Sequence, residues 1–281
     1  MKIIITGGNG FVGKPTITAL KAKNYPVINY DIQEGFDLLN VEQLKSVIQE
    51  GDKVLHLAAI ARFADADADP LLTYRVNVEG TKNVIEACEA KGAERLVYAS
   101  TGSVYMPLTT LPITEDLPIK GNSVYGCSKA VAEKMVEKIK IPYLILRYAH
   151  LYGEGKHGHG AIGGFLAKME KGERPVIFGG QQSNDFTFID DIVQANILAL
   201  ETENPDVFGQ AYNIGTGTEL TTIRVFEIMR EFFGYDKEFE ILPMRGVDPL
   251  RFAFDVNKAE RLLGFKAKYD FMLGLKKWFG A

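Results

Sequence analysis

The sequence is poor in cysteine and carries no excess of positive charge. Cys88 and Cys127 are the only cysteines in 281 residues, which excludes a disulfide scaffold and favours a reducing, cytoplasmic setting. The formal net charge of −4 argues against a nucleic-acid partner. No apolar run is long enough to span a bilayer, no secretory signal pattern opens the chain, and no internal repeat is present, so no membrane partner is expected. The 46% hydrophobic residues can fill one large core, with or without a smaller appended domain.

Three glycines near the start of the sequence have a regular spacing. Gly7, Gly10 and Gly13 follow a β-branched run at 2–6, and a helical pattern resumes at Phe11. A strand-to-helix turn of this kind presents backbone N–H groups and the positive end of a helix dipole to a diphosphate. The spacing predicts a dinucleotide-binding turn, although a glycine-rich turn without a ligand is the alternative.

An acidic residue follows the second predicted strand. The run 25–30 predicts that strand, and Asp31 ends it. A carboxylate there can accept hydrogen bonds from both hydroxyls of an adenosine ribose and would repel a 2′-phosphate. No Arg or Lys lies between Asp31 and Val41, so we expect NAD rather than NADP. An ordinary turn Asp is the alternative.

Strands and helices alternate through the first half of the chain. The apolar patterns predict strands at 2–6, 25–30, 36–37, 54–57, 96–100 and 143–146, and helices at 11–22, 41–49, 71–91 and 125–139. The second half predicts strands at 176–178 and 211–214, and helices at 190–201, 221–233, 256–263 and 271–279. This order is typical of an α/β fold with a Rossmann-like, doubly wound parallel sheet. We predict a nucleotide-binding domain over 1–150 and a smaller, mixed α/β substrate-binding region over 151–281, from which about 185–215 returns to the main domain.

A Tyr and a Lys lie four residues apart at the start of the predicted helix 125–139. At this spacing Tyr125 and Lys129 share one helix face. A neighbouring ammonium and a cofactor cation both favour the phenolate, so we expect Lys129 and the cofactor to lower the pKa of Tyr125 and to suit it to proton transfer during hydride transfer. A hydroxyl from 100–105, at the end of the preceding strand, would orient the substrate oxygen. The motif alone is common by chance, and its meaning depends on the glycine turn upstream.

Together these motifs resemble the extended short-chain dehydrogenases/reductases, in the NAD-dependent epimerase/dehydratase group. The matching segments are 6–13, 31, 37–38, 56–59, 77–81, 98–101, 125–129, 146–148, 151–153, 186–191, 212–215 and 245–248. The resemblance extends over almost the whole chain. It is specific for the family and much less specific for the substrate.

The resemblance implies roles for individual residues. Catalysis would rest on Thr101, Tyr125 and Lys129. The residues that would bind NAD are Gly7, Gly10, Phe11, Val12, Gly13, Asp31, Asp37, Leu38, Leu57, Ala58, Ala59, Asn77, Ser100, Tyr125, Lys129 and Tyr148. The residues that would meet the substrate, a nucleoside-diphosphate sugar, are Thr101, Tyr125, His150, Asn184, Arg245 and Arg251. Family members of this type dimerise through two long helices, which correspond here to about 71–91 and 125–139.

Departures from the family pattern narrow the chemistry. Gly102 and Ser103 follow Thr101, where 4,6-dehydratases have an acidic pair, so elimination of water is not expected. Asn184 stands where an Arg usually binds the diphosphate, which weakens the case for a nucleotide sugar. His157 and His159 lack further ligands at a metal-binding spacing, so no metal is expected.

The sequence therefore predicts an NAD-dependent epimerase or oxidoreductase that acts at a carbinol, C4 by preference, of a nucleotide sugar. Two other hypotheses stay open. One is an NAD(P)H-dependent ketoreductase of a 4-keto nucleotide sugar or a smaller carbonyl compound. The other is a non-catalytic NAD-sensing regulator built on the same fold.

Overall fold

A computed structural model of the chain describes residues 1–105, 110–154, 160–244 and 250–281. Its main sheet has six parallel strands in the order β10-β5-β4-β3-β1-β2. In chain order these are β1 (Ile3–Thr6), β2 (Val27–Tyr30), β3 (Lys53–His56), β4 (Arg95–Thr101), β5 (Tyr143–Tyr148) and β10 (Gln210–Ile214). Parallel strands need crossover connections, and helices provide most of them here. The Rossmann-like α/β class predicted from the sequence is confirmed.

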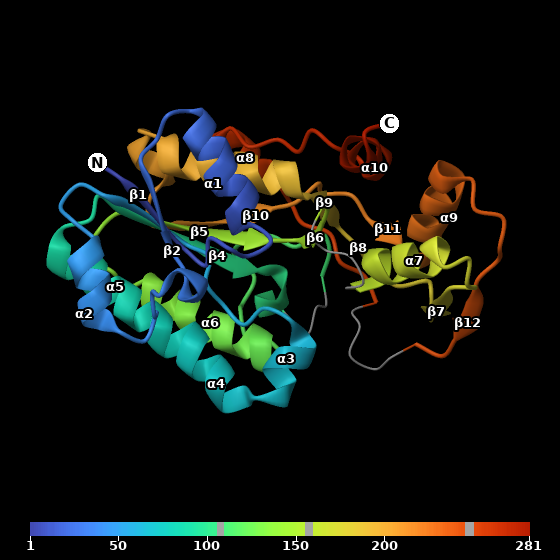
Figure 1. Ribbon diagram of the computed structural model, residues 1–281, viewed down its shortest axis with the longest axis horizontal. Coiled ribbons are helices and arrows are strands. Elements are labelled where there is room, and N and C mark those ends of the chain that lie inside the picture. The colour runs from blue at the N-terminus through green and yellow to red at the C-terminus, as the bar shows by residue number, and fades with distance from the viewer. Residues whose placement is uncertain (106–109, 155–159, 245–249) are drawn as a thin grey trace.

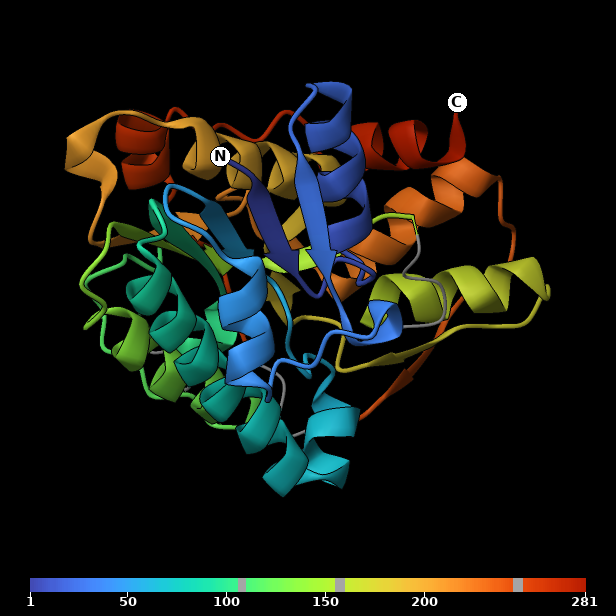
Figure 2. The same cartoon turned by 60° about the vertical axis from the view of Figure 1, so that its left-hand side comes forward.

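Helices cover both faces of this sheet. Figures 1 and 2 show α1 (Gly13–Ala22) and α8 (Ile189–Glu201) together on one face, and α2 (Val41–Val47), α5 (Gly80–Lys91) and α6 (Val124–Val136) on the other. Two buried apolar clusters fill the two interfaces, one around Ile5 and Leu146 and one around Ile4 and Val84. Because both faces are covered, β1, β3, β4 and β5 are buried almost throughout.

Smaller elements of the second half lie at one end of the main sheet (Figure 1). They form three two-stranded pairs, β6 (His150–Tyr152) with β9 (Phe186–Phe188), β7 (Val176–Phe178) with β12 (Glu240–Leu242), and β8 (Ser183–Asn184) with β11 (Leu220–Thr221). Helices α7 (Gly160–Glu170), α9 (Thr222–Phe233) and α10 (Phe271–Phe279) accompany them. In contrast, α8 and β10 belong to the main sheet and its helix layer. The domain boundary at 150 stays a prediction.

Some elements differ from the sequence-based expectation. No strand forms at 36–37, because the hydroxyl of Tyr30 donates to the carbonyl of Asp37 at 2.8 Å and holds the chain in a turn. The helix predicted at 71–91 is continuous but not uniform: α4 (Pro70–Tyr74) passes through a π-helical segment (Arg75–Glu79) into α5. Similarly, the helix predicted at 256–263 is mostly a π-helical segment (Ala259–Leu263). The remaining short helix that bears on the site is α3 (Phe63–Ala68).

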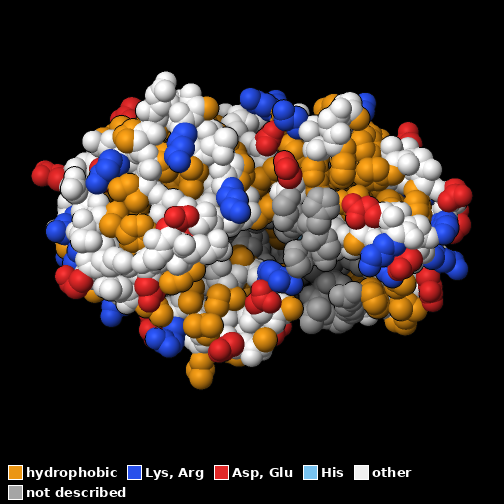
Figure 3. Space-filling model, in the orientation of Figure 1, with side chains coloured by type: hydrophobic (Ala, Val, Ile, Leu, Met, Phe, Trp, Pro, Cys, Tyr) orange, Lys and Arg blue, Asp and Glu red, His pale blue; other side chains and the backbone are white. Residues whose placement is uncertain are grey.

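Charged side chains of both signs lie on the surface of the molecule. Figure 3 shows basic and acidic side chains interspersed over this face of the molecule. Over the described ranges, no helix combines the length and the apolar character needed to cross a membrane. The same ranges contain no group of three or more His, Cys, Asp or Glu side chains arranged to hold a metal ion. His157 and His159 lie outside the described residues.

Candidate active site

A large cavity opens at the carboxyl ends of the parallel strands. Its volume is about 840 Å³, which is within the usual range for ligand pockets. The register explains its position: Thr6 pairs with both Tyr30 and His56, and Thr101 pairs with Tyr148, so the residues at and after these strand ends share one edge. This is where open α/β sheets bind ligands.

The glycine turn forms one wall of the cavity because no side chain fits there. Gly7 has a φ of 70°, and a Cβ atom on it would lie 2.6 Å from Cα of Ala58. A Cβ atom on Gly13 would lie 2.5 Å from the carbonyl oxygen of Gly7. The N-terminal end of α1 therefore faces the cavity with bare backbone, as a diphosphate site requires.

Asp31 lies beside this turn and is fixed by backbone donors. It is 8% exposed, and its two carboxylate oxygens accept hydrogen bonds from the N–H groups of Asn9 and Gln33, each at 3.0 Å. The described residues that line the cavity between 30 and 39 include no Lys or Arg. Nothing described there would neutralise a 2′-phosphate, which agrees with the expectation of NAD.

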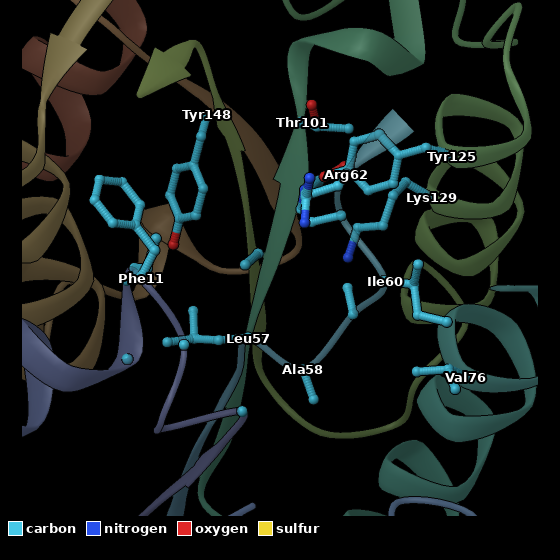
Figure 4. Close-up of a pocket in the computed structure, with 18 of the residues that line it drawn as sticks. Phe11, Leu57, Ala58, Ile60, Arg62, Val76, Thr101, Tyr125, Lys129 and Tyr148 are labelled. Carbon is cyan, nitrogen blue, oxygen red and sulfur yellow. The ribbon is translucent and has the colours of Figure 1, made fainter. Parts of the chain in front are cut away.

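The other end of the cavity brings together Thr101, Tyr125 and Lys129 (Figure 4). Thr101 is the last residue of β4, and its Oγ1 accepts a hydrogen bond from the N–H of Ser103 at 3.2 Å. Tyr125 and Lys129 are one turn apart at the start of α6, where Ser123 caps the helix by accepting from the N–H of Gly126 at 3.0 Å. The three predicted catalytic side chains thus line one cavity with the glycine turn.

Burial favours the neutral form of both Tyr125 and Lys129. It raises the pKa of Tyr125 to about 12, a rise that a hydrogen bond with Thr101 opposes. It lowers the pKa of Lys129 to about 7, although the charge of Glu133 opposes that fall. Burial therefore dominates the pKa of Tyr125 in the chain alone, and the expected lowering by Lys129 and the cofactor's positive charge stays a prediction for the cofactor-bound protein.

Lys129 is 3% exposed, and two groups that do not line the cavity stabilise its charged form. Its Nζ lies 4.1 Å from the centroid of the Tyr98 ring, a cation–π contact. Glu133, which is fully buried one turn further along α6, accepts hydrogen bonds from Ser100 Oγ at 2.7 Å and from Arg147 Nε at 2.9 Å. Sequence reasoning did not identify Glu133, although its four-residue spacing from Lys129 was a usable signal.

The structure places Asn77 beside the site rather than in it. Asn77 is 1% exposed and does not line the cavity. Its side chain bonds both polar backbone groups of Ile60: it accepts from the N–H at 2.8 Å and donates to the carbonyl at 3.1 Å. It also donates to Ser128 Oγ at 2.9 Å. Asn77 thereby ties the loop after β3 to the helix that carries Tyr125.

The other predicted cofactor residues do line the cavity. They are Gly7, Gly10, Phe11, Val12, Gly13, Asp31, Asp37, Leu38, Leu57, Ala58, Ala59, Ser100, Tyr125, Lys129 and Tyr148. Figure 4 shows Phe11, Leu57 and Tyr148 on one side, opposite Tyr125 and Lys129.

The predicted substrate residues are only partly brought together. His150 lines the cavity and packs edge-on against Phe252, with ring centroids 5.4 Å apart. Asn184 and Arg251 do not line it: Asn184 is paired with Leu220 in the β8–β11 pair, and Arg251 is engaged with Glu219, its Nε donating at 2.9 Å. Arg245 lies outside the described residues.

Arg62 and Phe252 are among the lining residues that the sequence-based predictions did not include. Arg62 lies at the end of the cavity that holds Tyr125 (Figure 4), and the ring of Phe252 lies against Gly102, the residue after Thr101. Neither belongs to a recognisable motif, and only the fold brings them to the catalytic groups.

One cavity at the edge of the parallel sheet is lined by the glycine turn, by Asp31 and by Thr101, Tyr125 and Lys129. This combination defines a Rossmann-type, nucleotide-dependent oxidoreductase architecture. Comparison with known proteins gives the family. The model of the NAD dependent epimerase/dehydratase family matches residues 3–215, and the chain belongs to that family of extended short-chain dehydrogenases/reductases.

Relatives and solved structures align over nearly the full length. A protein of Methanocaldococcus jannaschii, provisionally named a UDP-glucose 4-epimerase, is 33% identical over 98% of this chain and 96% of its own. The UDP-glucose 4-epimerase of Thermotoga maritima, solved with UDP-glucose, superposes with a TM-score of 0.90 at 28% identity, covering 100% of this chain and 99% of that one. The UDP-glucuronic acid 4-epimerase of Bacillus cereus, solved with UDP-glucuronic acid and NAD, has a TM-score of 0.89 at 27% identity, covering 100% and 98%.

Proposed function

We propose that this protein is an NAD-dependent 4-epimerase of a nucleoside-diphosphate sugar. The observation that carries the proposal is the convergence of Thr101, Tyr125 and Lys129 on a cavity whose other end has the glycine turn and Asp31. The family, and the relatives named as UDP-sugar 4-epimerases, support the same reaction.

The site residues divide the work between binding and proton transfer. When bound, NAD supplies a hydride acceptor that can return the hydride to the opposite face of a 4-keto sugar. Tyr125 takes the proton from the C4 hydroxyl as the C4–H bond breaks, and gives it back when that bond re-forms. Thr101 holds the same oxygen by a hydrogen bond. Lys129 stabilises the phenolate with its positive charge and can donate to the cofactor ribose.

Dehydratase chemistry is disfavoured by packing as well as by residue type. A Cβ atom on Gly102 would lie 2.3 Å from Cζ of Phe252, a buried ring that itself lines the cavity. An acidic side chain at this position would force Phe252 to move. The residue after Thr101 therefore cannot supply the acid that elimination of water needs.

One experiment separates the epimerase from its rivals. The purified protein is incubated with UDP-glucose and NAD, and the sugar is followed by NMR while the absorbance of NADH is recorded. We expect UDP-galactose to form without net NADH, and Tyr125→Phe to lower kcat by at least 10²-fold, in the range known for general acid–base groups, while NAD affinity is kept. Tyr143→Phe, at the first residue of β5 and outside the cavity lining, is the matched control.

The other outcomes have distinct signatures. Net oxidation of NADH with a 4-keto sugar, and free exchange of the cofactor, would identify a ketoreductase. Binding of NAD with no conversion of several UDP-sugars would contradict enzymatic function and favour the NAD-sensing regulator.

We further propose a homodimer that forms through the helices α4–α5 and α6. Large apolar side chains are exposed there: Leu71 is 81% exposed, Val131 is 44% exposed and Tyr74 is 38% exposed. Figure 3 shows orange side chains at the lower edge of the molecule, where Figure 1 has α4. Contiguous exposed apolar residues mark interaction surfaces. Light scattering after gel filtration should give twice the 31.1 kDa chain mass, and Leu71→Glu with Val131→Glu should give monomers.

A further inference from the structure

Of the two cationic side chains described at the cavity, Arg62 is the more exposed and the more weakly held. Among the described lining residues, Lys and Arg occur only at Lys129 and Arg62. Lys129 is buried against Tyr98, whereas the Arg62 side chain is 58% exposed and makes an ion pair with Asp65 at 3.5 Å. An exposed pair three residues apart contributes little to stability, so Arg62 can exchange Asp65 for a ligand anion at small cost.

Several contacts fix the position of Arg62 at the catalytic end. The next residue, Phe63, packs edge-on against the ring of Tyr125, with centroids 5.7 Å apart and an interplanar angle of 86°. Two residues earlier, the backbone of Ile60 is held by Asn77. Figure 4 draws Arg62 among Thr101, Tyr125 and Lys129, and all four side chains line the same cavity. The cofactor phosphates, in contrast, belong at the glycine turn.

We propose that Arg62 binds an anionic oxygen group of the substrate. The inference rests on the proposed function, since it assigns a partner to the sugar-nucleotide half of that reaction. It also supplies a guanidinium group for the substrate, because Asn184 occupies the usual position of a diphosphate-binding Arg and does not line the cavity. Guanidinium groups pair with phosphate or carboxylate through two parallel hydrogen bonds. The anion is therefore either the diphosphate or a carboxylate on the sugar, and these two sources are distinguishable by experiment.

The test compares two probes, UDP-glucose and UDP-glucuronic acid, by calorimetric titration of the NAD-loaded protein. Arg62→Ala should weaken binding by roughly 10–100-fold, as expected for loss of a charge-assisted hydrogen-bonded pair. In turnover it should raise KM much more than it lowers kcat, with NAD affinity unchanged. Equal losses with both probes identify the diphosphate as the anion. A loss confined to UDP-glucuronic acid identifies the carboxylate.

Matched variants separate ligand binding from a structural role. Arg224→Ala removes another exposed ion pair of the same i,i+3 spacing, with Glu227 at 3.0 Å on α9, and should change nothing. Asp65→Asn leaves Arg62 without its carboxylate and should bind both probes at least as tightly as the natural chain. The proposal is overturned if Arg62→Ala binds both probes normally, if it weakens NAD instead, or if Asp65→Asn is equally damaging. If the natural chain binds neither probe, the proposed substrate class fails, and the role of Arg62 fails with it.

Discussion

Tyr125 and Lys129 lie one helical turn apart in the same cavity, and burial drives both toward their uncharged forms. The pKa of Tyr125 is raised to about 12 and that of Lys129 is lowered to about 7. Proton transfer by a phenolate needs the opposite arrangement, a charged Lys beside an ionisable Tyr. Positive charge from the oxidised cofactor, when bound, acts in that direction on Tyr125. At neutral pH the electrostatic cost falls on Lys129 alone, because Tyr125 is uncharged there in both the folded and the unfolded chain.

The cost of burying the charged Lys129 side chain should lower the free energy of unfolding in a pH-dependent way. Its pKa is lowered from 10.5 to about 7, so the unfolded chain binds more protons between these values and the free energy of unfolding rises with pH across that window. We expect Lys129→Met to be more stable than the natural chain at pH 6, by up to about 5 kcal/mol, and the gain to disappear above pH 10. Urea unfolding at several pH values measures this. Lys134→Met, at an exposed position of the same helix, should show no such gain.

Glu133 should control both stability and the charge of Lys129. It is 0% exposed and neutralises the buried Arg147, so Glu133→Gln should cost about 3–5 kcal/mol. Because Glu133 raises the pKa of Lys129, its loss should also move the alkaline limb of the rate profile to lower pH. A profile measured well below the melting temperature separates the two effects. Glu137→Gln, at the exposed pair with Lys134, is the control. An unshifted limb would mean that Glu133 acts on folding alone.

Local spacing accounts for most of what the sequence could predict. Gly7 and Gly13 are recognisable because the close approach of backbone to backbone demands glycine at those positions. Tyr125 and Lys129 are recognisable because helical spacing places them on one face. Asn77 was expected in the cofactor site, but its partner Ile60 lies 17 residues away, and only the folded chain shows the contact.

The sequence-based predictions failed where contacts in the folded chain decide the local structure. A short strand was predicted at 36–37, but the hydroxyl of Tyr30 donates to the carbonyl of Asp37 and holds this segment as a turn. The π-helical segment (Arg75–Glu79) hardly alters the hydrophobic period, so the sequence gives no sign of it. Arg62 carries no motif, and its place at the cavity follows from Phe63 packing on Tyr125.

Asp31 should decide between the two nicotinamide cofactors. Its carboxylate accepts hydrogen bonds from the N–H groups of Asn9 and Gln33. The described residues that line this part of the cavity include no Lys or Arg. Asp31→Asn keeps an acceptor but removes the charge that repels a 2′-phosphate. We expect NAD affinity to fall roughly tenfold and the preference for NAD over NADP to shrink, as fluorescence titration with both cofactors would show. Glu34→Gln, at an exposed neighbouring carboxylate, should leave the preference unchanged.

Gly102 should be intolerant of even one added methyl group. A Cβ atom there would lie 2.3 Å from Cζ and 2.7 Å from Cε2 of Phe252, a ring that is 1% exposed and packs on His150. Gly102→Ala should therefore cost about 1–3 kcal/mol and raise the KM for the sugar, because the displaced ring moves the cavity wall. Gly164→Ala is the matched control, since nothing lies within 4 Å of a Cβ atom at that helical position and the change should stabilise α7 by about 0.5–1 kcal/mol. Adding Phe252→Leu to Gly102→Ala should recover part of the lost stability, because a smaller side chain leaves room for the new methyl group. Thermal unfolding of the three variants checks the argument, and a double variant no more stable than Gly102→Ala would show that the clash with Phe252 is not the cause.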